Sequence, residues 1–177
     1  MIALLARLRV ALGFVFGVLV FVLAKPDRNA LIAGALVAGA GEAVRIWAAG
    51  HLHKSREVTA SGPYRWTAHP LYAGSSIMGA GLAIMCASVP AAILIAVYLA
   101  VTLTAAIKSE EAYLRRTFGD QYDLYKNGLE EKRARASRRR FSLAQAIANR
   151  EYRAVIGLAV VILMLILKAR YTGNSGM

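Results

Sequence analysis

Five long apolar segments alternate with polar stretches along the chain. They cover residues 4–23, 30–49, 70–87, 91–107 and 154–167. A helix needs about 20 mostly apolar residues to cross a membrane, so the pattern predicts an all-α polytopic membrane protein with about five transmembrane helices. The last segment is the shortest, and it approaches spanning length only if the helix also includes Lys168 and Arg170, whose side chains can extend to the interface.

Only Ser88, Val89 and Pro90 separate the third apolar segment from the fourth. Such a short connection makes the two helices antiparallel neighbours, so we expect a helical hairpin. Within the second segment, Glu42 and Arg45 are ionisable residues at a spacing of three. Ionisable residues in a spanning segment are candidates for function, but an ion pair within one helix is the simpler interpretation.

The polar segment after the fourth apolar segment differs in character from the rest of the chain. Residues 108–140 are charged but carry aromatic and apolar side chains at helical spacing, which predicts one or two amphipathic helices at the membrane interface. Residues 141–153 are a candidate second interfacial helix, and the basic run 132–140 suits anionic lipid headgroups. We expect the tail, residues 172–177, to be disordered.

Composition and charge narrow the class of protein. The chain is 58% hydrophobic and has a net charge of +12, and its basic residues flank the apolar segments. This placement favours lipid headgroups over nucleic acid as the anionic partner. A single cysteine, Cys86, excludes an internal disulfide, and no metal site is expected.

Charge placement also predicts the topology. The polar stretches 51–67 and 108–153 are rich in Lys and Arg, which places them in the cytoplasm, with the N-terminus inside and the C-terminus outside. Lys25 and Arg28 then fall on the outer side, a mild conflict. The first apolar segment has no convincing cleavage site, and we interpret it as a retained helix. We expect an integral protein of a plasma membrane, of the bacterial inner-membrane type.

We expect one domain of 177 residues. Residues 1–50 hold the N-terminal spans, 51–130 a core that binds a ligand, and 131–177 the basic interfacial segment and the last span. The oligomeric state is left open, because the small residues Gly74, Gly79 and Gly81 can pack helices within one chain or between chains. Gly34, Gly39 and Gly41 in the second segment also permit close approach of helices.

The most distinctive polar stretch is GPYRWTAHPLYAG, residues 62–74. Pro70 suits the first turn of a helix, and the unpaired N–H groups of such a turn attract anions. Tyr64, Trp66 and Tyr72 offer aromatic walls, although Tyr64 and Trp66 could equally be interfacial anchors.

Glu110 and Glu111 follow the fourth apolar segment, where they could simply mark the water boundary. The hairpin also brings them to the membrane face at which residues 62–74 lie. The combination of a helix start, aromatic side chains and paired carboxylates suits a zwitterionic ligand with an aromatic base.

Several motifs in this order resemble the isoprenylcysteine carboxyl methyltransferases and the related membrane phospholipid N-methyltransferases. The motifs are Gly62-Pro63-Tyr64, then His69-Pro70-Leu71-Tyr72-Ala73-Gly74, then Glu110-Glu111-Ala112-Tyr113-Leu114, and Phe118-Gly119 followed by Tyr122 and Tyr125. The resemblance covers residues 41–125. It implies binding of S-adenosylmethionine at the cytosolic face, in a cleft formed with cytosolic amphipathic helices, and methyl transfer to a lipophilic acceptor that enters from the bilayer.

The resemblance also assigns residues. Cofactor binding is expected from Arg56, Glu57, Val58, Thr59, Tyr64, His69, Pro70, Leu71, Tyr72 and Glu110, with Lys54 as a neighbouring candidate. Arg56 to Thr59 match the family by position only. Transfer from a sulfonium needs mainly alignment and exclusion of water. A protonated amine must first lose a proton, and Glu111 or Tyr72 is the expected catalytic relay.

Two alanines depart from the isoprenylcysteine pattern. Ala68 and Ala106 stand where those enzymes have arginines. A carboxylate acceptor would use such a cation for orientation, so the acceptor is expected to be a lipid amine or another lipid group unless Lys108 or Arg65 substitutes. Two alternatives stay open. One is a non-enzymatic lipid-binding or assembly protein, and the other is a sterol-reductase-like enzyme that binds nicotinamide.

Overall fold

The computed structural model describes residues 2–53, 59, 61–119 and 140–173, with the backbone alone for residues 2–12. This part of the chain is all-α and contains no strand. The elements are α1 (Ile2–Leu23), α2 (Arg28–His51), the 3₁₀ turn η1 (Gly62–Arg65), α3 (Pro70–Cys86), α4 (Val89–Phe118), α7 (Leu143–Ala148) and α8 (Tyr152–Tyr171). The predicted fold class is therefore confirmed.

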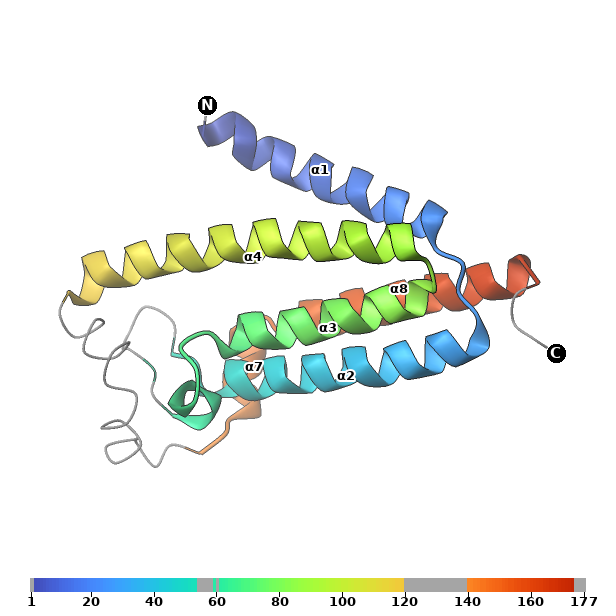
Figure 1. Ribbon diagram of the computed structural model, residues 1–177. Coiled ribbons are helices and arrows are strands. Elements are labelled where there is room, and N and C mark those ends of the chain that lie inside the picture. The colour runs from blue at the N-terminus through green and yellow to red at the C-terminus, as the bar shows by residue number, and fades with distance from the viewer. Residues whose placement is uncertain (1, 54–58, 60, 120–139, 174–177) are drawn as a thin grey trace.

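The long helices α1, α2, α3, α4 and α8 run roughly along one axis and alternate in direction (Figure 1). The start of α1, the end of α2, the start of α3 and the end of α4 lie at one end of the bundle, together with η1 and α7 (Figure 1). The α3–α4 turn and the end of α8 lie at the other end, so the start of α1 and the end of α8 are at opposite ends of the bundle (Figure 1).

Three of the described helices are long and apolar enough to cross a membrane, by length and composition: α2, α4 and α8. The segment Gly13–Leu23 of α1 and the helix α3 are apolar but shorter. The helices expected from the apolar pattern are all present, whereas the count of about five spans stays a prediction. Helix α8 includes Lys168 and Arg170, which meets the condition under which the last apolar segment approaches spanning length.

Helix α4 differs from the prediction at its C-terminal end. It has 30 residues and continues to Phe118, so residues 108–118 extend the fourth helix and do not begin a separate interfacial one. The helix ends at Gly119, which has a φ of 50°. The expected interfacial helix in 141–153 is shorter than predicted, because α7 has only six residues. The amphipathic and basic stretch 120–139 lies outside the described residues.

The hairpin of α3 and α4 is confirmed. Ala87 ends α3 in the left-handed region with a φ of 43°, and α4 begins at Val89 with Pro90 in its first turn. The backbone N–H of Lys25 donates to the carbonyl of Cys86 over 2.7 Å. The connection between α1 and α2 is thereby joined to the turn of the hairpin.

Helices α2 and α3 pack with their backbones in contact. A Cβ atom on Gly81 would lie 2.3 Å from the backbone nitrogen of Ala38, and one on Gly41 would lie 2.4 Å from that of Met78. These small residues therefore pack helices within the chain. Gly39 does not share this role, contrary to expectation, because a Cβ there would have nothing within 4 Å.

The segment around α7 caps the end of α2. The side-chain amide of Asn149 donates to the carbonyls of Ala49 (2.8 Å) and Leu52 (2.9 Å). Gln145 also donates to the carbonyl of Leu52, over 2.9 Å. The last carbonyls of a helix have no partner within it, so these bonds fix the C-terminal segment against α2.

Asn149→Ala is expected to lower the free energy of unfolding by about 1–2 kcal/mol, because each lost hydrogen bond contributes roughly 1 kcal/mol. Equilibrium unfolding in mixed detergent micelles measures the change. Arg153→Gln is the control, since the Arg153 side chain is exposed. Equal stability of both variants would mean that the amide contributes nothing to the cap.

Candidate functional site

A cavity of about 1770 Å³ lies among α1, α3, α4 and α8. Its polar lining groups include Arg45, Thr59, Tyr64, Tyr72, Ser75, Ser109 and Glu110. The remaining walls are mostly apolar and include Phe14, Phe16, Phe21, Leu82, Leu99, Met164 and Leu165. The polar groups come largely from the end of the bundle that holds η1 and the first turn of α3 (Figure 1). The cavity therefore has a polar end and a long apolar part.

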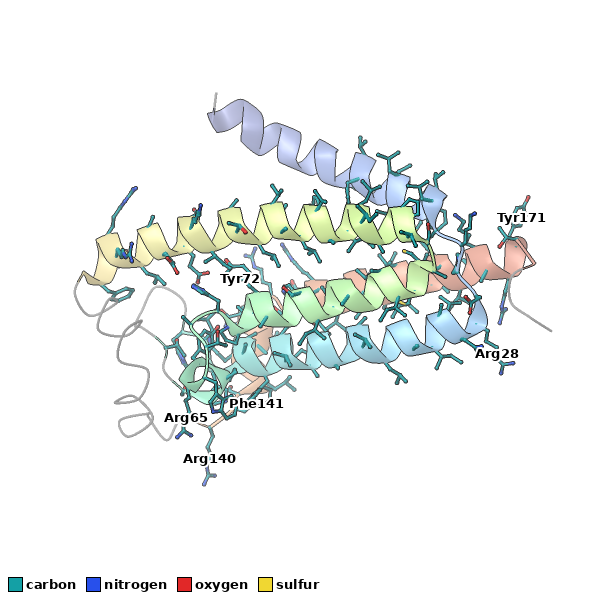
Figure 2. The ribbon with its side chains drawn as sticks, in the orientation of Figure 1. Arg28, Arg65, Tyr72, Arg140, Phe141 and Tyr171 are labelled. Carbon is teal, nitrogen blue, oxygen red and sulfur yellow. The ribbon has the colours of Figure 1, made fainter. Side chains whose placement is uncertain are left out.

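Tyr72 and Glu110 meet across the α3–α4 hairpin. Tyr72 lies in the first turn of α3, between α3 and α4 (Figure 2). Its hydroxyl interacts with the Glu110 carboxylate, and both side chains line the cavity. The hairpin positions this pair, because the start of α3 and the last turns of α4 lie at one end of the bundle.

His69 and Glu111 form a second pair beside the first. The Nε2 atom of His69 lies 3.2 Å from Oε1 of Glu111, and both side chains are largely buried. The rings of His69 and Tyr72 are 5.8 Å apart. Glu111 is not among the described residues that line the large cavity, whereas His69 lines a smaller groove of about 510 Å³ between α3 and α4. The adjacent glutamates of α4 thus face different partners.

The stretch before α3 contributes one buried and one exposed aromatic side chain. Tyr64, in η1, is buried and lines the cavity. Trp66 is 60% exposed and packs against Trp47, with ring centroids 5.3 Å apart. Gly62 has a φ of 58°, and a Cβ there would lie 2.4 Å from the His51 ring. The backbone before α3 therefore runs directly against the end of α2.

The other predicted residues fall into two groups. Pro70 is buried at the start of α3, Leu71 lines the cavity, and Thr59 is buried and lines it as well. The Oγ1 atom of Thr59 accepts a hydrogen bond of 3.3 Å from the backbone N–H of His53. The remaining predicted binding residues lie outside the described part of the chain: Lys54, Arg56, Glu57 and Val58.

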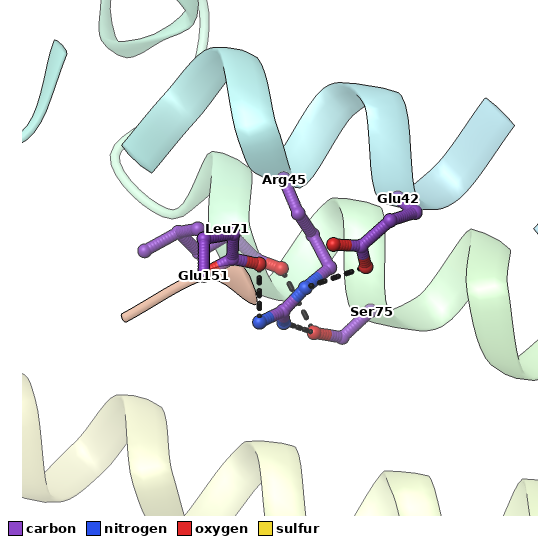
Figure 3. Close-up of polar contacts among 5 residues, drawn as sticks. All are labelled: Glu42, Arg45, Leu71, Ser75 and Glu151. Atoms are coloured by element: carbon purple, nitrogen blue, oxygen red, sulfur yellow. Dashed lines mark hydrogen bonds and ion pairs between the residues drawn. The ribbon is translucent and has the colours of Figure 1, made fainter. Parts of the chain in front are cut away.

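Arg45 is a cavity residue that the sequence interpretation did not assign to the site. The expected ion pair exists, with Nε of Arg45 3.4 Å from Oε2 of Glu42. The guanidinium also lies 2.7 Å from Oε1 of Glu151 and donates to Oγ of Ser75 (Figure 3). Among the described lining residues Arg45 is the one basic side chain. The sequence feature that could have identified Arg45 as a site residue was its position as an ionisable residue within an apolar segment.

Two alanines line the cavity where the isoprenylcysteine enzymes are expected to have arginines. Ala68 and Ala106 are both among the lining residues, whereas Lys108 and Arg65 are not. The guanidinium that faces this cavity thus comes from α2.

The apolar helices indicate an integral membrane protein, and its cavity has a polar end beside η1 and the first turn of α3. A family model for phospholipid methyltransferase matches residues 31–121, just over half of the chain. The chain therefore belongs to the phospholipid methyltransferase family, a family of membrane methyltransferases that act on lipids. Searches of the curated proteins and of the solved structures found no match.

The family match covers α2 from residue 31 onward and all of η1, α3 and α4, and it includes Arg45, Tyr72, Glu110 and Glu111. Helices α1, α7 and α8 lie outside it, although α1 and α8 supply much of the apolar wall. Thus the matched region holds the polar end of the cavity, and segments from both ends of the chain add to its apolar wall.

Proposed function

We propose that the protein transfers a methyl group from S-adenosylmethionine to an amine of a membrane lipid. The observation that carries this proposal is the Tyr72–Glu110 pair at the polar end of an apolar cavity, in a member of the phospholipid methyltransferase family. When bound, the cofactor supplies a sulfonium-activated methyl group, so the protein has mainly to align the reactants and exclude water.

The size of the cavity supports this proposal. Pockets for drug-sized ligands measure about 300–1000 Å³, whereas this cavity measures about 1770 Å³. It has room for a cofactor and for part of a lipid. At the polar end, the cofactor would be held by Thr59, Tyr64, Leu71, Tyr72 and Glu110. His69 and Pro70, at the start of α3, would support these residues. By resemblance alone, Lys54, Arg56, Glu57 and Val58 belong to the same proposal.

An amine acceptor must lose a proton before it can accept a methyl group. Tyr72 lines the cavity, and its hydroxyl interacts with the Glu110 carboxylate. His69, which pairs with Glu111, is next to Tyr72, with the two ring centroids 5.8 Å apart. We propose that Tyr72 orients the amine and that Glu111, paired with His69, is the relay for the proton.

The proposed orientation places the polar end of the cavity in the cytoplasm. Arg65 and Arg140 lie at this end of the bundle (Figure 2), which agrees with an excess of basic residues on the inner side. The start of α1 lies at the same end (Figure 1), so the N-terminus would be inside. In this proposal the chain forms one domain in a plasma membrane, and its basic segment 132–140 contacts anionic headgroups.

The test uses purified protein in vesicles of phosphatidylethanolamine and phosphatidylglycerol, incubated with methyl-labelled S-adenosylmethionine. We expect label in the lipid extract, on the amine of phosphatidylethanolamine, detected by mass spectrometry. Folded protein that binds no S-adenosylmethionine by calorimetry would contradict the proposal. Lipid binding without cofactor binding would support the lipid-binding alternative, and nicotinamide binding would support a reductase.

A further inference from the structure

Three segments of the chain hold the Arg45 guanidinium at the cavity wall (Figure 3). Glu42 lies one turn earlier on α2, and Ser75 comes from α3. Glu151 comes from the residue before α8 and lies 2.7 Å from a terminal guanidinium nitrogen. Both glutamates are buried, so this arrangement is a fixed part of the interior.

Neutralisation of the Arg45 charge does not by itself account for both carboxylates of this cluster. Glu42 alone offsets the charge of Arg45, yet a second carboxylate is buried against the same guanidinium. Burial of an additional charge is costly. The geometric effect of Glu151 is directional, because it and Ser75 each engage a terminal nitrogen of the guanidinium. We infer that Glu151 fixes the direction of the guanidinium.

The guanidinium keeps donors available for a ligand. It has five N–H donors in a planar fork, and contacts with Glu42, Ser75 and Glu151 engage three of its nitrogens. One further N–H remains on each terminal nitrogen, and the side chain lines the cavity. Two such donors suit adjacent oxygens of a phosphate.

The depth of Arg45 distinguishes it from the proposed cofactor residues. Its partner Ser75 lies one turn further along α3 than Leu71, and Met78 and Leu82 continue the cavity wall on the same helix. The guanidinium therefore lies between the polar end, with Tyr72, and the apolar part. A lipid whose tails occupied the apolar part would place its headgroup at this level.

We propose that Arg45 binds a phosphate oxygen of the acceptor lipid and that Glu151 is the positioning residue that holds Arg45 for this contact. This inference rests on the proposed methyl transfer. Glu151 belongs to the C-terminal segment, which lies outside the family match. In this inference that segment takes part in acceptor recognition. Two carboxylates offset the charge of Arg45, so it attracts free anions only weakly. It instead recognises the phosphate of a lipid bound in the cavity, through directed hydrogen bonds.

The experiment compares two acceptors in the full-length protein. Phosphatidylethanolamine has an amine and a phosphate, whereas oleylamine has an amine and an apolar tail without phosphate. Arg45→Gln is expected to raise the KM for phosphatidylethanolamine about 10–100-fold, the range for loss of a hydrogen bond between charged groups. The KM for oleylamine and the Kd for S-adenosylmethionine should change less than about threefold.

Glu151→Gln tests the positioning role without loss of the guanidinium. It is expected to raise the KM for phosphatidylethanolamine about 3–10-fold, and Glu151→Asp should lie between it and the wild type. The double variant Arg45→Gln/Glu151→Gln should be no worse than Arg45→Gln alone, since Glu151 acts through Arg45. Arg153→Gln is the matched control: it changes an exposed side chain two residues after Glu151 and should leave both KM values unchanged.

The phosphate contact and the positioning role of Glu151 are overturned by different results. Equal effects of Arg45→Gln on both acceptors, or a change mainly in the cofactor Kd, would overturn the phosphate contact, as would competitive inhibition by millimolar inorganic phosphate. If Arg45→Gln does not fold, an unchanged KM in Glu151→Gln still overturns the positioning role. A wild type that labels oleylamine but not phosphatidylethanolamine would overturn this inference while methyl transfer stood. A wild type that labels no lipid would instead contradict the proposed function.

Discussion

Glu110→Gln is expected to weaken the binding of S-adenosylmethionine about 100-fold, which corresponds to about 2.7 kcal/mol. Glu110 is the one carboxylate among the described residues that line the cavity, and in the proposed function it holds the cofactor. A hydrogen bond to a charged group contributes about 1.5–3 kcal/mol. The loss of that charge at the polar end should therefore appear directly in the cofactor Kd.

Calorimetry in detergent, with S-adenosylmethionine as the titrant, measures this change. Glu111→Gln is the comparison, because the neighbouring glutamate has the same chemistry but pairs with His69. Its cofactor Kd should stay within about threefold of the wild-type value, although its turnover should fall if Glu111 relays a proton. A larger effect on the Kd from Glu111→Gln than from Glu110→Gln would reverse the two assignments.

Gly81→Ala is expected to destabilise the protein by about 1–3 kcal/mol, the usual cost of overpacking. The new Cβ would lie 2.3 Å from the backbone nitrogen of Ala38 and 2.5 Å from the carbonyl oxygen of Gly34. Backbone atoms cannot move aside as a flexible side chain can, so α2 and α3 would have to separate. Because these two helices carry Arg45 and Tyr72, the polar end of the cavity would be disturbed as well.

Gly39→Ala is the matched control for this prediction. It is also in a helix interior, where alanine is favoured over glycine by about 1 kcal/mol, but its Cβ would meet nothing within 4 Å. Equilibrium unfolding in mixed micelles should therefore show a stability at or above that of the wild type. Equal stability of the two alanine variants would mean that α2 and α3 do not pack as closely as the structure indicates.

The hydrophobic pattern determined the positions of the long helices, because the length of an apolar segment and its polar boundaries are local properties of the chain. The short Ser88–Pro90 connection also determined that α3 and α4 form a hairpin. From this it followed that residues 62–74 and the paired glutamates share one end of the bundle, which the structure confirms.

Local patterns were less informative where a helix crosses the membrane boundary. The change from apolar to charged residues at Lys108 suggested a new element, whereas α4 continues to Phe118. Hydropathy reports where a helix leaves an apolar environment, but backbone hydrogen bonding continues until a residue such as Gly119 ends it. The sequence likewise placed Gly39 and Gly41 together, and only the rotation of α2 against α3 separates their roles.

The sequence by itself determined the helices, the hairpin and the stretch at which the polar end of the cavity forms. The tertiary structure decided which of the adjacent glutamates faces the cavity, because that depends on the rotation of α4 about its axis. It also decided that Arg45 faces the cavity and meets Glu151. No local pattern joins residues so far apart in the chain, and their contact exists only because α7 fastens the last segment to the end of α2.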